Sequence, residues 1–320
     1  MPDRTSYNPK LELLPPDLSP LREGNTGIAY VTTLDSGQPG PHVVVNALTH
    51  GNELCGAYAL LFVLEHGLRP SRGKLTLSCA NVAAFRRFDP EQPYQSRYVD
   101  EDFNRLWSPE VLDGPRDSAE LRRARELRPL IERADFLLDI HSMHLPCAPL
   151  MLCGLQEKSL RLARRMAYPA HLVCDEGHQA GRRMRDHGAF DDPARPQAAL
   201  LVECGQHWMA DTRATAIRTL LHFLRACEVV TAEAVAPLLD PSPREPQRVI
   251  EVTEAVTIAT DDCRFAEDYM GLEVVPRRGT VILHDGGRAV RTPYDDCVLI
   301  MPGRSLAPGL TAVRLGRFVA

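Results

Sequence analysis

HVVVNALTHGNELCGAYALLFVLEHG, residues 42–67, is the stretch that decides the fold. Its first seven residues, 42–48, form a continuous apolar run, which predicts a strand buried on both faces of a sheet. Residues 54–67 have helical character and end at a glycine that can cap a helix. A buried strand followed at once by a helix is the repeating unit of a parallel α/β sheet.

The same alternation continues outward from this stretch. Residues 1–40 are Pro-rich and are expected to be irregular. Further strands are predicted at 75–80, 136–140, 150–153 and 198–202, and helices at 118–134, 159–167 and 211–227. Strand–helix alternation of this kind predicts an α/β fold with a mostly parallel, doubly wound sheet flanked by helices.

The pattern changes near a Pro-rich segment at about residues 237–244, which we interpret as a linker. Beyond it, helical periodicity disappears, and short apolar runs such as VIEVTEAVTIA and CVLIMPG alternate with Gly, Pro and Asp. We therefore expect a catalytic domain at 1–236 and a smaller C-terminal all-β domain at 245–320.

Composition narrows the class of protein. The 320 residues hold 37 Lys and Arg against 42 Asp and Glu, a net charge of −5, so neither nucleic acid nor a membrane is the expected partner. The first residues, MPDRTSYNPK, contain no apolar h-region, so we expect no secretory signal, and no apolar run approaches the roughly 18 residues of a spanning helix. The nine cysteines are scattered and never form CxxC, which argues against a disulfide framework and against a Cys-rich zinc site, and we expect a cytoplasmic protein.

Residues capable of metal binding or acid–base chemistry follow three of the apolar runs. The first run is followed by His50 and Glu53, the second by His141, and the third by Glu203. Because ligands of open α/β sheets gather at the carboxyl ends of the strands, we expect these side chains to converge. Taken singly, each has an ordinary structural explanation, such as a surface histidine or a carboxylate at a helix N-terminus.

Two imidazoles and one carboxylate leave one open position on a tetrahedral Zn²⁺ ion, which is the catalytic pattern. His50, Glu53 and His141 are therefore the candidate ligands of one zinc ion, and Glu203 is the candidate base for a water. Asp139 precedes His141 by two residues and can orient its ring. His144 is a competing ligand candidate, which we rank second because Leu145 and Pro146 place it in a loop.

The polar stretch SRYVDEDFNRLW, residues 96–107, contains Arg97, Asn104 and Arg105. A guanidinium suits a substrate carboxylate or a developing oxyanion. On composition alone, a solvated loop whose alternating charges pair with each other is the better explanation of the segment.

Four short motifs follow one another along the chain, HGNE (50–53), RYVDEDFNR (97–105), DIH (139–141) and VECG (202–205). Together, and in this order, they resemble the succinylglutamate desuccinylase/aspartoacylase family, a branch of the zinc carboxypeptidase-like hydrolases. The resemblance implies zinc bound by His50, Glu53 and His141, and Glu203 as general base and acid. It also implies that Arg97 polarises the scissile carbonyl and that Asn104 and Arg105 bind the substrate carboxylate.

The resemblance leaves the substrate side chain unassigned. Family members use further Arg and Tyr residues for a second carboxylate, and no position here aligns with them. The unresolved candidates are Arg182, Arg183, Arg185, Tyr269 and Tyr294.

The expected activity is zinc-dependent hydrolysis of a small N-acyl amino acid, with a zinc-activated water as nucleophile. One alternative is a metallocarboxypeptidase that acts on short peptides or peptidoglycan fragments. Another is an inactive relative that binds a small acid or a partner protein. The sequence leaves the acyl group, the amino acid and homo-oligomerisation open.

Overall fold

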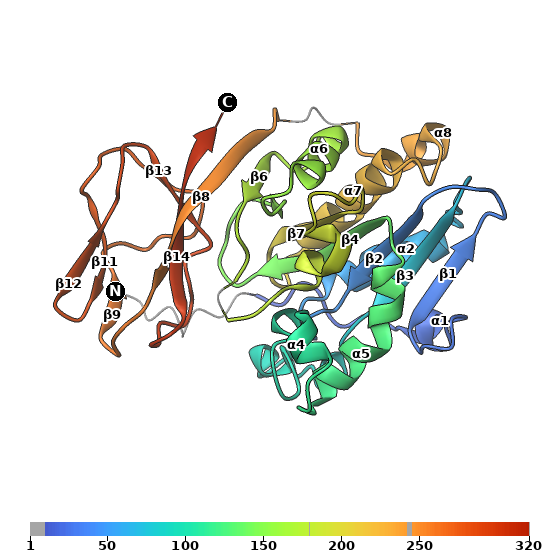
Figure 1. The fold of residues 1–320 in the computed structure, drawn as a ribbon, viewed down its shortest axis with the longest axis horizontal. Coiled ribbons are helices and arrows are strands. Elements are labelled where there is room, and N and C mark those ends of the chain that lie inside the picture. The colour runs from blue at the N-terminus through green and yellow to red at the C-terminus, as the bar shows by residue number, and fades with distance from the viewer. Residues whose placement is uncertain (1–9, 179, 242–244, 320) are drawn as a thin grey trace.

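A long mixed β-sheet runs through the molecule (Figure 1). The computed structural model describes residues 10–178, 180–241 and 245–319. Along the sheet the strand order is β1-β3-β2-β4-β7-β5-β6-β8-β14-β13-β10. Its strands are β1 (Val31–Asp35), β2 (His42–Ala47), β3 (Lys74–Cys79), β4 (Phe136–Met143), β5 (Leu150–Leu152), β6 (His171–Cys174), β7 (Ala198–Gln206), β8 (Arg248–Thr257), β10 (Val274–Val275), β13 (Cys297–Ile300) and β14 (Thr311–Val319).

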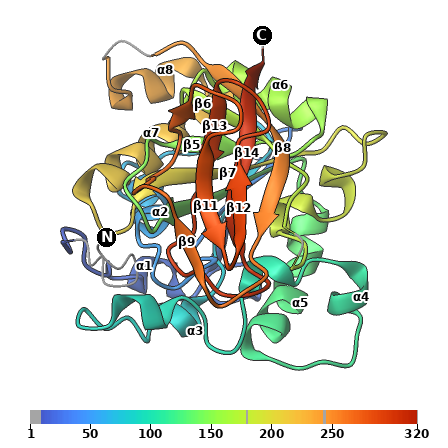
Figure 2. The ribbon, with the colours of Figure 1, turned by 90° about the vertical axis from the view of Figure 1, so that its left-hand side faces the viewer.

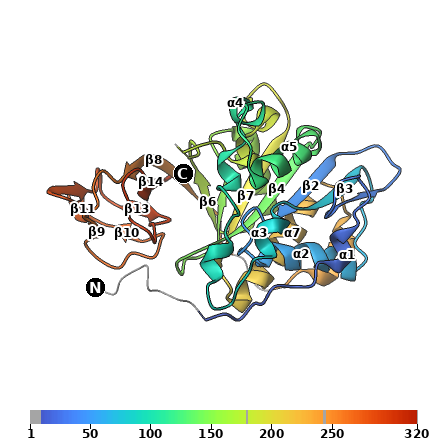
Figure 3. The same ribbon diagram turned by 90° about the horizontal axis from the view of Figure 1, so that it is seen from below.

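Helices cover both faces of the first half of this sheet, which Figure 3 shows edge-on between α5 and the pair α2 and α7. The α-helices are α1 (Ser19–Arg22), α2 (Cys55–Glu65), α3 (Val82–Phe85), α4 (Pro109–Leu112), α5 (Ala119–Glu132), α6 (Glu157–Met166), α7 (Ala210–Ala226) and α8 (Ala232–Val235). Short 3-10 turns are η2 (Pro93–Ser96), η3 (Phe103–Arg105), η4 (Met184–Asp186), η5 (Gly188–Phe190) and η6 (Ala236–Leu238).

Alternate residues of each strand enter different hydrophobic cores. Val45 and Val202 pack with α2, α6 and α7, whereas Val44 and Leu137 pack with α5. The apolar runs were continuous because both faces of these strands are buried. Since β3, β2, β4 and β7 pair in parallel, the predicted mostly parallel, doubly wound sheet is confirmed.

Some sequence-based boundaries were wrong. Strand β1 and helix α1 lie within residues 1–40, where we expected irregular chain, and β6 was not expected. Strand β1 lies at the edge of the sheet and has only five residues, so its periodicity is too short to detect. Strands β4 and β7 continue past the predicted ends, so His141 and Glu203 lie on the strands and not beyond them.

The C-terminal strands extend the same sheet, because β8 pairs in parallel with β6. A second, three-stranded antiparallel sheet contains β9 (Cys263–Phe265), β11 (Val281–Asp285) and β12 (Arg288–Arg291), and it faces the viewer in Figure 2. Between this small sheet and the C-terminal strands of the long sheet lies a separate hydrophobic core. The predicted linker includes residues 242–244, which lie outside the described residues, and the two-domain division stays a prediction.

Within the described ranges, no helix has both the length and the apolar character that crossing a bilayer requires.

Candidate active site

The turn between β2 and α2 carries His50 and Glu53. Gly51, at the centre of this turn, lies against the chain near α3, where an added Cβ would clash with backbone atoms of Ala84 and Phe85. The Gly51 N–H also donates a hydrogen bond to the carbonyl oxygen of Arg97, at 3.0 Å. Only glycine permits this approach, which holds the turn against the segment that contains Arg97.

Three buried side chains form the group that could hold a metal. The Nδ1 atoms of His50 and His141 lie 2.8 Å from Oε1 and Oε2 of Glu53, respectively. One potential ligand atom of each residue lies within 4.8 Å of those of the other two. The structure thus brings together the three residues that the sequence analysis selected as metal ligands.

Two further carboxylates, Asp139 and Asp102, contact the ring nitrogens of the two histidines that do not face Glu53. Asp139 Oδ2 lies 2.7 Å from Nε2 of His141, while Asp139 Oδ1 accepts hydrogen bonds from Asn46 and Thr49 at 2.8 and 2.7 Å. Asp102 Oδ1 lies 3.1 Å from Nε2 of His50. Carboxylates in this position hold an imidazole in one orientation.

Asp102 was missed by the sequence analysis, although it lies inside the RYVDEDFNR motif. Its carboxylate also contacts Arg97 at 3.1 Å and accepts a hydrogen bond from the Asn104 backbone N–H at 2.9 Å. Its position two residues before Asn104 was the only feature of the sequence that pointed to it. Asp100 and Glu101 directly precede it, and the sequence gave no reason to prefer Asp102 over these two carboxylates.

The donor set fits a divalent metal. His141 has a carboxylate oxygen at each ring nitrogen, and a neutral imidazole can donate only one N–H. Burial opposes a charge on this ring, but Asp139 and Glu53 outweigh it and raise the pKa of His141 well above its usual value. A metal ion held by His50, Glu53 and His141 could replace that proton, because the Nε2–H of His141 would still donate to Asp139. Two imidazoles and one carboxylate are typical ligands of catalytic zinc.

Glu203 lies on β7 directly beside His141, its partner in the parallel β4–β7 pairing. The side chain is buried, and among the described residues its Oε2 has no hydrogen-bond partner. Burial raises the pKa of Glu203 to about 8, assisted by the charges of Glu53 and Asp139 and opposed by His141 and Arg97. A carboxyl group with a pKa near neutrality can both accept and donate a proton.

Arg97 reaches the same group of side chains. Its guanidinium lies 3.3 Å from Glu53, 2.9 Å from Nε2 of His50 and 3.1 Å from Asp102. Arg97 also lines the cleft in which His50, Glu53 and Glu203 are accessible. The geometry therefore places a fixed cation at the edge of the candidate metal group.

Asn104 and Arg105 occupy different positions. Asn104 is buried behind the histidines, where its Nδ2 lies 3.3 Å from both Asp139 and His141 and its Oδ1 accepts the Met184 N–H at 2.8 Å. Arg105 is partly exposed and lies 3.7 Å from Asp102. Substrate binding by these two residues stays a prediction, and the contacts of Asn104 are those of a residue that positions His141.

The cleft has a volume of about 150 Å³, and residues from distant parts of the chain line it. Besides His50, Glu53, Arg97 and Glu203, its lining is Ser142, Met143, His144, Leu145, Met270, Met301, Pro302, Gly303 and Arg304. The last five come from the C-terminal β region, and no motif in the sequence identified them. Most of these nine further lining residues are apolar, so the charged residues of the site share the cleft with an apolar wall.

His144 belongs to that wall and not to the metal group. Its ring stacks on Tyr94 with centroids 5.3 Å apart, and it meets His207 edge-on at 4.8 Å. Burial lowers the pKa of His144 well below its usual value, assisted by the charge on Arg97. The geometry thus favours His141 over His144 as a metal ligand.

None of the five unresolved candidates is among the residues that line this cleft. Arg182 forms an ion pair with Asp191 at 3.0 Å on the surface, and Tyr294 shares a hydrogen bond with Thr253 at 2.6 Å. Arg183 and Arg185 are buried in ion pairs, while Tyr269 packs in the C-terminal core.

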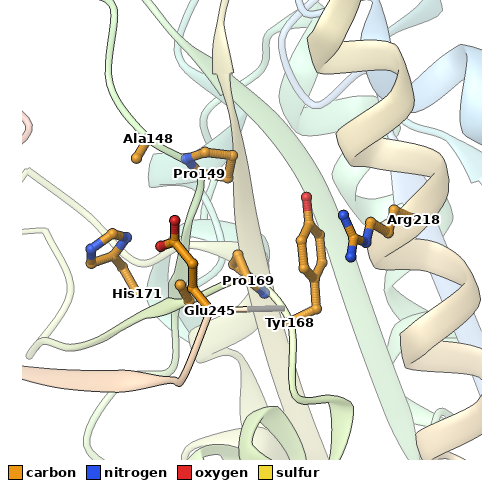
Figure 4. Close-up of a pocket in the computed structure, with 8 residues that line it drawn as sticks. Ala148, Pro149, Tyr168, Pro169, His171, Arg218 and Glu245 are labelled. Carbon is orange, nitrogen blue, oxygen red and sulfur yellow. The ribbon is translucent and has the colours of Figure 1, made fainter. Parts of the chain in front are cut away.

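A separate cavity of about 260 Å³ lies between α7 and the strands β5 and β6 (Figure 4). Tyr168 and Arg218 stand side by side in it, with the guanidinium 4.7 Å from the ring centroid. Its lining shares no residue with the cleft, so it takes no part in the site around His50.

Comparison with known proteins shows the family of this chain. Residues 39–231 match the family model described as the succinylglutamate desuccinylase/aspartoacylase catalytic domain. Two relatives, from Rattus norvegicus and Homo sapiens, are each named N-acyl-aromatic-L-amino acid amidohydrolase (carboxylate-forming). They are 34% identical over 119 residues and 33% identical over 116 residues. The alignments cover 33% of this chain in both cases, and only 35% and 34% of the two relatives.

Solved structures share the fold over most of their length. A succinylglutamate desuccinylase/aspartoacylase from Rhodobacter sphaeroides superposes with a TM-score of 0.65 at 17% identity, covering 91% of this chain and 89% of the other. Murine aminoacylase 3 superposes with a TM-score of 0.60 at 19% identity, covering 88% and 96%. At this identity the superpositions establish the fold, while the family model spans more than half of the chain. The chain therefore belongs to the succinylglutamate desuccinylase/aspartoacylase family.

Proposed function

We propose that this protein is an amidohydrolase that uses one Zn²⁺ ion, held by His50, Glu53 and His141, to cleave small N-acyl amino acids. The observation that carries the proposal is the position of Glu203. Its buried carboxyl group has an oxygen free of hydrogen bonds among the described residues and a pKa of about 8, and it lies beside the three candidate ligands. The names of the related amidohydrolases support an N-acyl amino acid as the substrate class.

When bound, zinc supplies a Lewis acid that makes a water molecule nucleophilic near neutral pH. Glu203 accepts a proton from the attacking water and later donates a proton to the departing nitrogen. Arg97 donates hydrogen bonds to the carbonyl oxygen as negative charge develops there. One water is consumed, its oxygen joins the acyl carbon, and the products are a carboxylate and a free amine.

The lining of the cleft supports a small substrate with an apolar group. Met143, Leu145, Met270 and Met301 supply flexible apolar contacts opposite the charged residues. Because the last two come from the C-terminal region, that region narrows the space open to an extended peptide. This supports an acylated amino acid over the peptides that a carboxypeptidase would need to admit.

A hydrolysis screen with the zinc-loaded protein tests the proposal. The substrates are N-acetyl-L-phenylalanine, N-acetyl-L-aspartate, N-succinyl-L-glutamate and an unblocked tripeptide, and release of free amine is measured. We expect hydrolysis of at least one N-acyl amino acid and loss of that activity after chelation. Faster cleavage of the tripeptide would favour a peptidase, and a fully zinc-loaded protein without any hydrolysis would favour a binding protein.

A further inference from the structure

Glu120, in the first turn of α5, is a fully buried carboxylate that the proposed chemistry does not use. A glutamate at the start of a helix is ordinarily explained by the helix dipole, but glutamate side chains are almost never fully buried. Taking a carboxylate out of water is costly unless hydrogen bonds replace the lost hydration. The contacts of Glu120 therefore need to account for its burial.

Neutral N–H donors surround this carboxylate. Its Oε1 accepts hydrogen bonds from the Val99 N–H at 2.6 Å and from Nδ2 of Asn81 at 2.8 Å. Its Oε2 accepts the Asp100 and Glu101 N–H groups at 3.0 and 3.3 Å. Successive backbone N–H groups that converge in this way form an anion-binding concavity. Here the bound anion is a side chain of the same protein.

The backbone that Glu120 binds lies between two residues of the candidate site. Residues 99–101 separate Arg97 from Asp102, and these two contact Nε2 of His50 at 2.9 and 3.1 Å. Arg97 and Asp102 also contact each other at 3.1 Å, so residues 97–102 form a loop whose two ends meet at His50. Movement of the middle of this loop would displace both ends.

Further contacts tie the same loop to its surroundings. Oδ2 of Asp100 accepts the Ala119 N–H at 2.7 Å, so the loop and the start of α5 bind each other in both directions. Asn81, which donates to Glu120, also caps α3, the helix against which Gly51 lies. Glu120 therefore joins the loop to the two helices beside it.

We propose that Glu120 is a positioning residue, which fixes the 97–102 loop so that Arg97 and Asp102 reach His50. The reaction that this positioning serves rests on the proposed function. An ionised carboxylate suits the role because it only accepts hydrogen bonds, and every contact described above brings it a donor. A glutamine at this position would turn an NH₂ group toward N–H donors, so a nearly isosteric change tests the role.

The first measurement is kcat of zinc-loaded Glu120→Gln with the best N-acyl amino acid. We expect kcat to fall about 10- to 100-fold with KM nearly unchanged, because a misplaced Arg97 stabilises the oxyanion less well. Glu126→Gln is the matched control, because Glu126 lies on the same helix, is 49% exposed and pairs with Arg123. The control should keep the wild-type kcat.

A double-mutant cycle separates positioning from a loss of folded protein. If Glu120 acts through Arg97, Glu120→Gln should cost at most about 3-fold in kcat when Arg97 is already Met. Asp100→Ala loosens the loop from its exposed side, and it should lower kcat about 3- to 10-fold without any buried change. This variant carries the test if Glu120→Gln does not fold.

Zinc affinity provides a readout that does not depend on turnover. Because Asp102 orients His50, Glu120→Gln should weaken zinc binding about 10-fold in competition with a chelator, and Glu126→Gln should not. Wild-type kcat in Glu120→Gln, or an equal loss of kcat with and without Arg97, would overturn the positioning role. If the wild type hydrolyses no N-acyl amino acid but the difference in zinc affinity is found, the proposed function fails and the positioning role stands.

Discussion

His141 and Glu203 are direct partners in the parallel pairing of β4 with β7. Side chains at the same register of neighbouring strands project from the same face, so a candidate metal ligand and a candidate acid–base residue lie side by side. The sheet itself therefore sets their spacing, while Glu53 reaches the pair from the turn before α2.

Replacing Glu203 with Gln should lower kcat for the best N-acyl amino acid by about 10²- to 10⁴-fold, because the amide cannot accept the proton. The zinc content should stay at one ion per chain, since His50, Glu53 and His141 are unchanged. Steady-state kinetics and elemental analysis measure the two quantities. Glu233→Gln, an exposed change on α8, serves as the control. Normal turnover in Glu203→Gln would refute the role of Glu203.

Replacing Asp139 with Asn should weaken zinc binding about 10- to 100-fold, because the ring of His141 loses the charged acceptor at its Nε2. Competition with a chromogenic chelator measures the affinity. Asp262→Asn, which changes an exposed carboxylate in the C-terminal region, should leave it unchanged. Equal affinity in the Asp139 variant and the wild type would show that this carboxylate does not support the metal.

Replacing Arg183 with Met should lower the free energy of unfolding at pH 7 by about 3–5 kcal/mol, because Asp175 would remain charged, buried and without its main partner. In the wild type, burial opposes ionisation of Asp175, but Arg183 outweighs it and lowers the pKa of that carboxyl.

The sign of the pH dependence follows from this shift. The wild-type contribution is present above the unfolded pKa, near 4, and is lost as pH falls through the lower folded pKa. In the variant, burial would raise the folded pKa of Asp175, so acid relieves its penalty. Denaturation curves from pH 7 to pH 3.5 should therefore show the two proteins converging in stability. A difference that grows in acid would contradict the assignment.

Replacing Gly51 with Ala should destabilise the protein by about 1–3 kcal/mol, since the new Cβ meets backbone atoms that cannot move aside cheaply. Activity should fall as well, because the same contact holds Arg97 against the turn. Gly287→Ala is the control, since an added Cβ there meets no atom within 4 Å. Thermal unfolding of both variants, compared with the wild type, provides the measurement.

Local patterns were sufficient to predict the central strands and helices. The run at 42–48 was recognisable as a strand because both faces of β2 are buried and its apolar residues are therefore continuous. Strand β6 was not recognised, because only its two central residues are buried and it therefore has no continuous apolar run, unlike the equally short β5. A short strand is stabilised by hydrogen bonds to its neighbouring strands, and the local sequence does not indicate which strands these are.

For the site, the sequence by itself determined which residue types carry the chemistry. His50 and Glu53 follow β2, whereas His141 and Glu203 lie in the carboxyl-terminal halves of β4 and β7, so their convergence follows from the parallel order of these strands. Only the tertiary structure placed Asp102 against His50, 52 positions away, and brought Met270 and Met301 to the cleft that His50 lines. Those contacts depend on how loops and the C-terminal strands pack on the sheet, and packing between distant segments leaves no periodic signal in the chain.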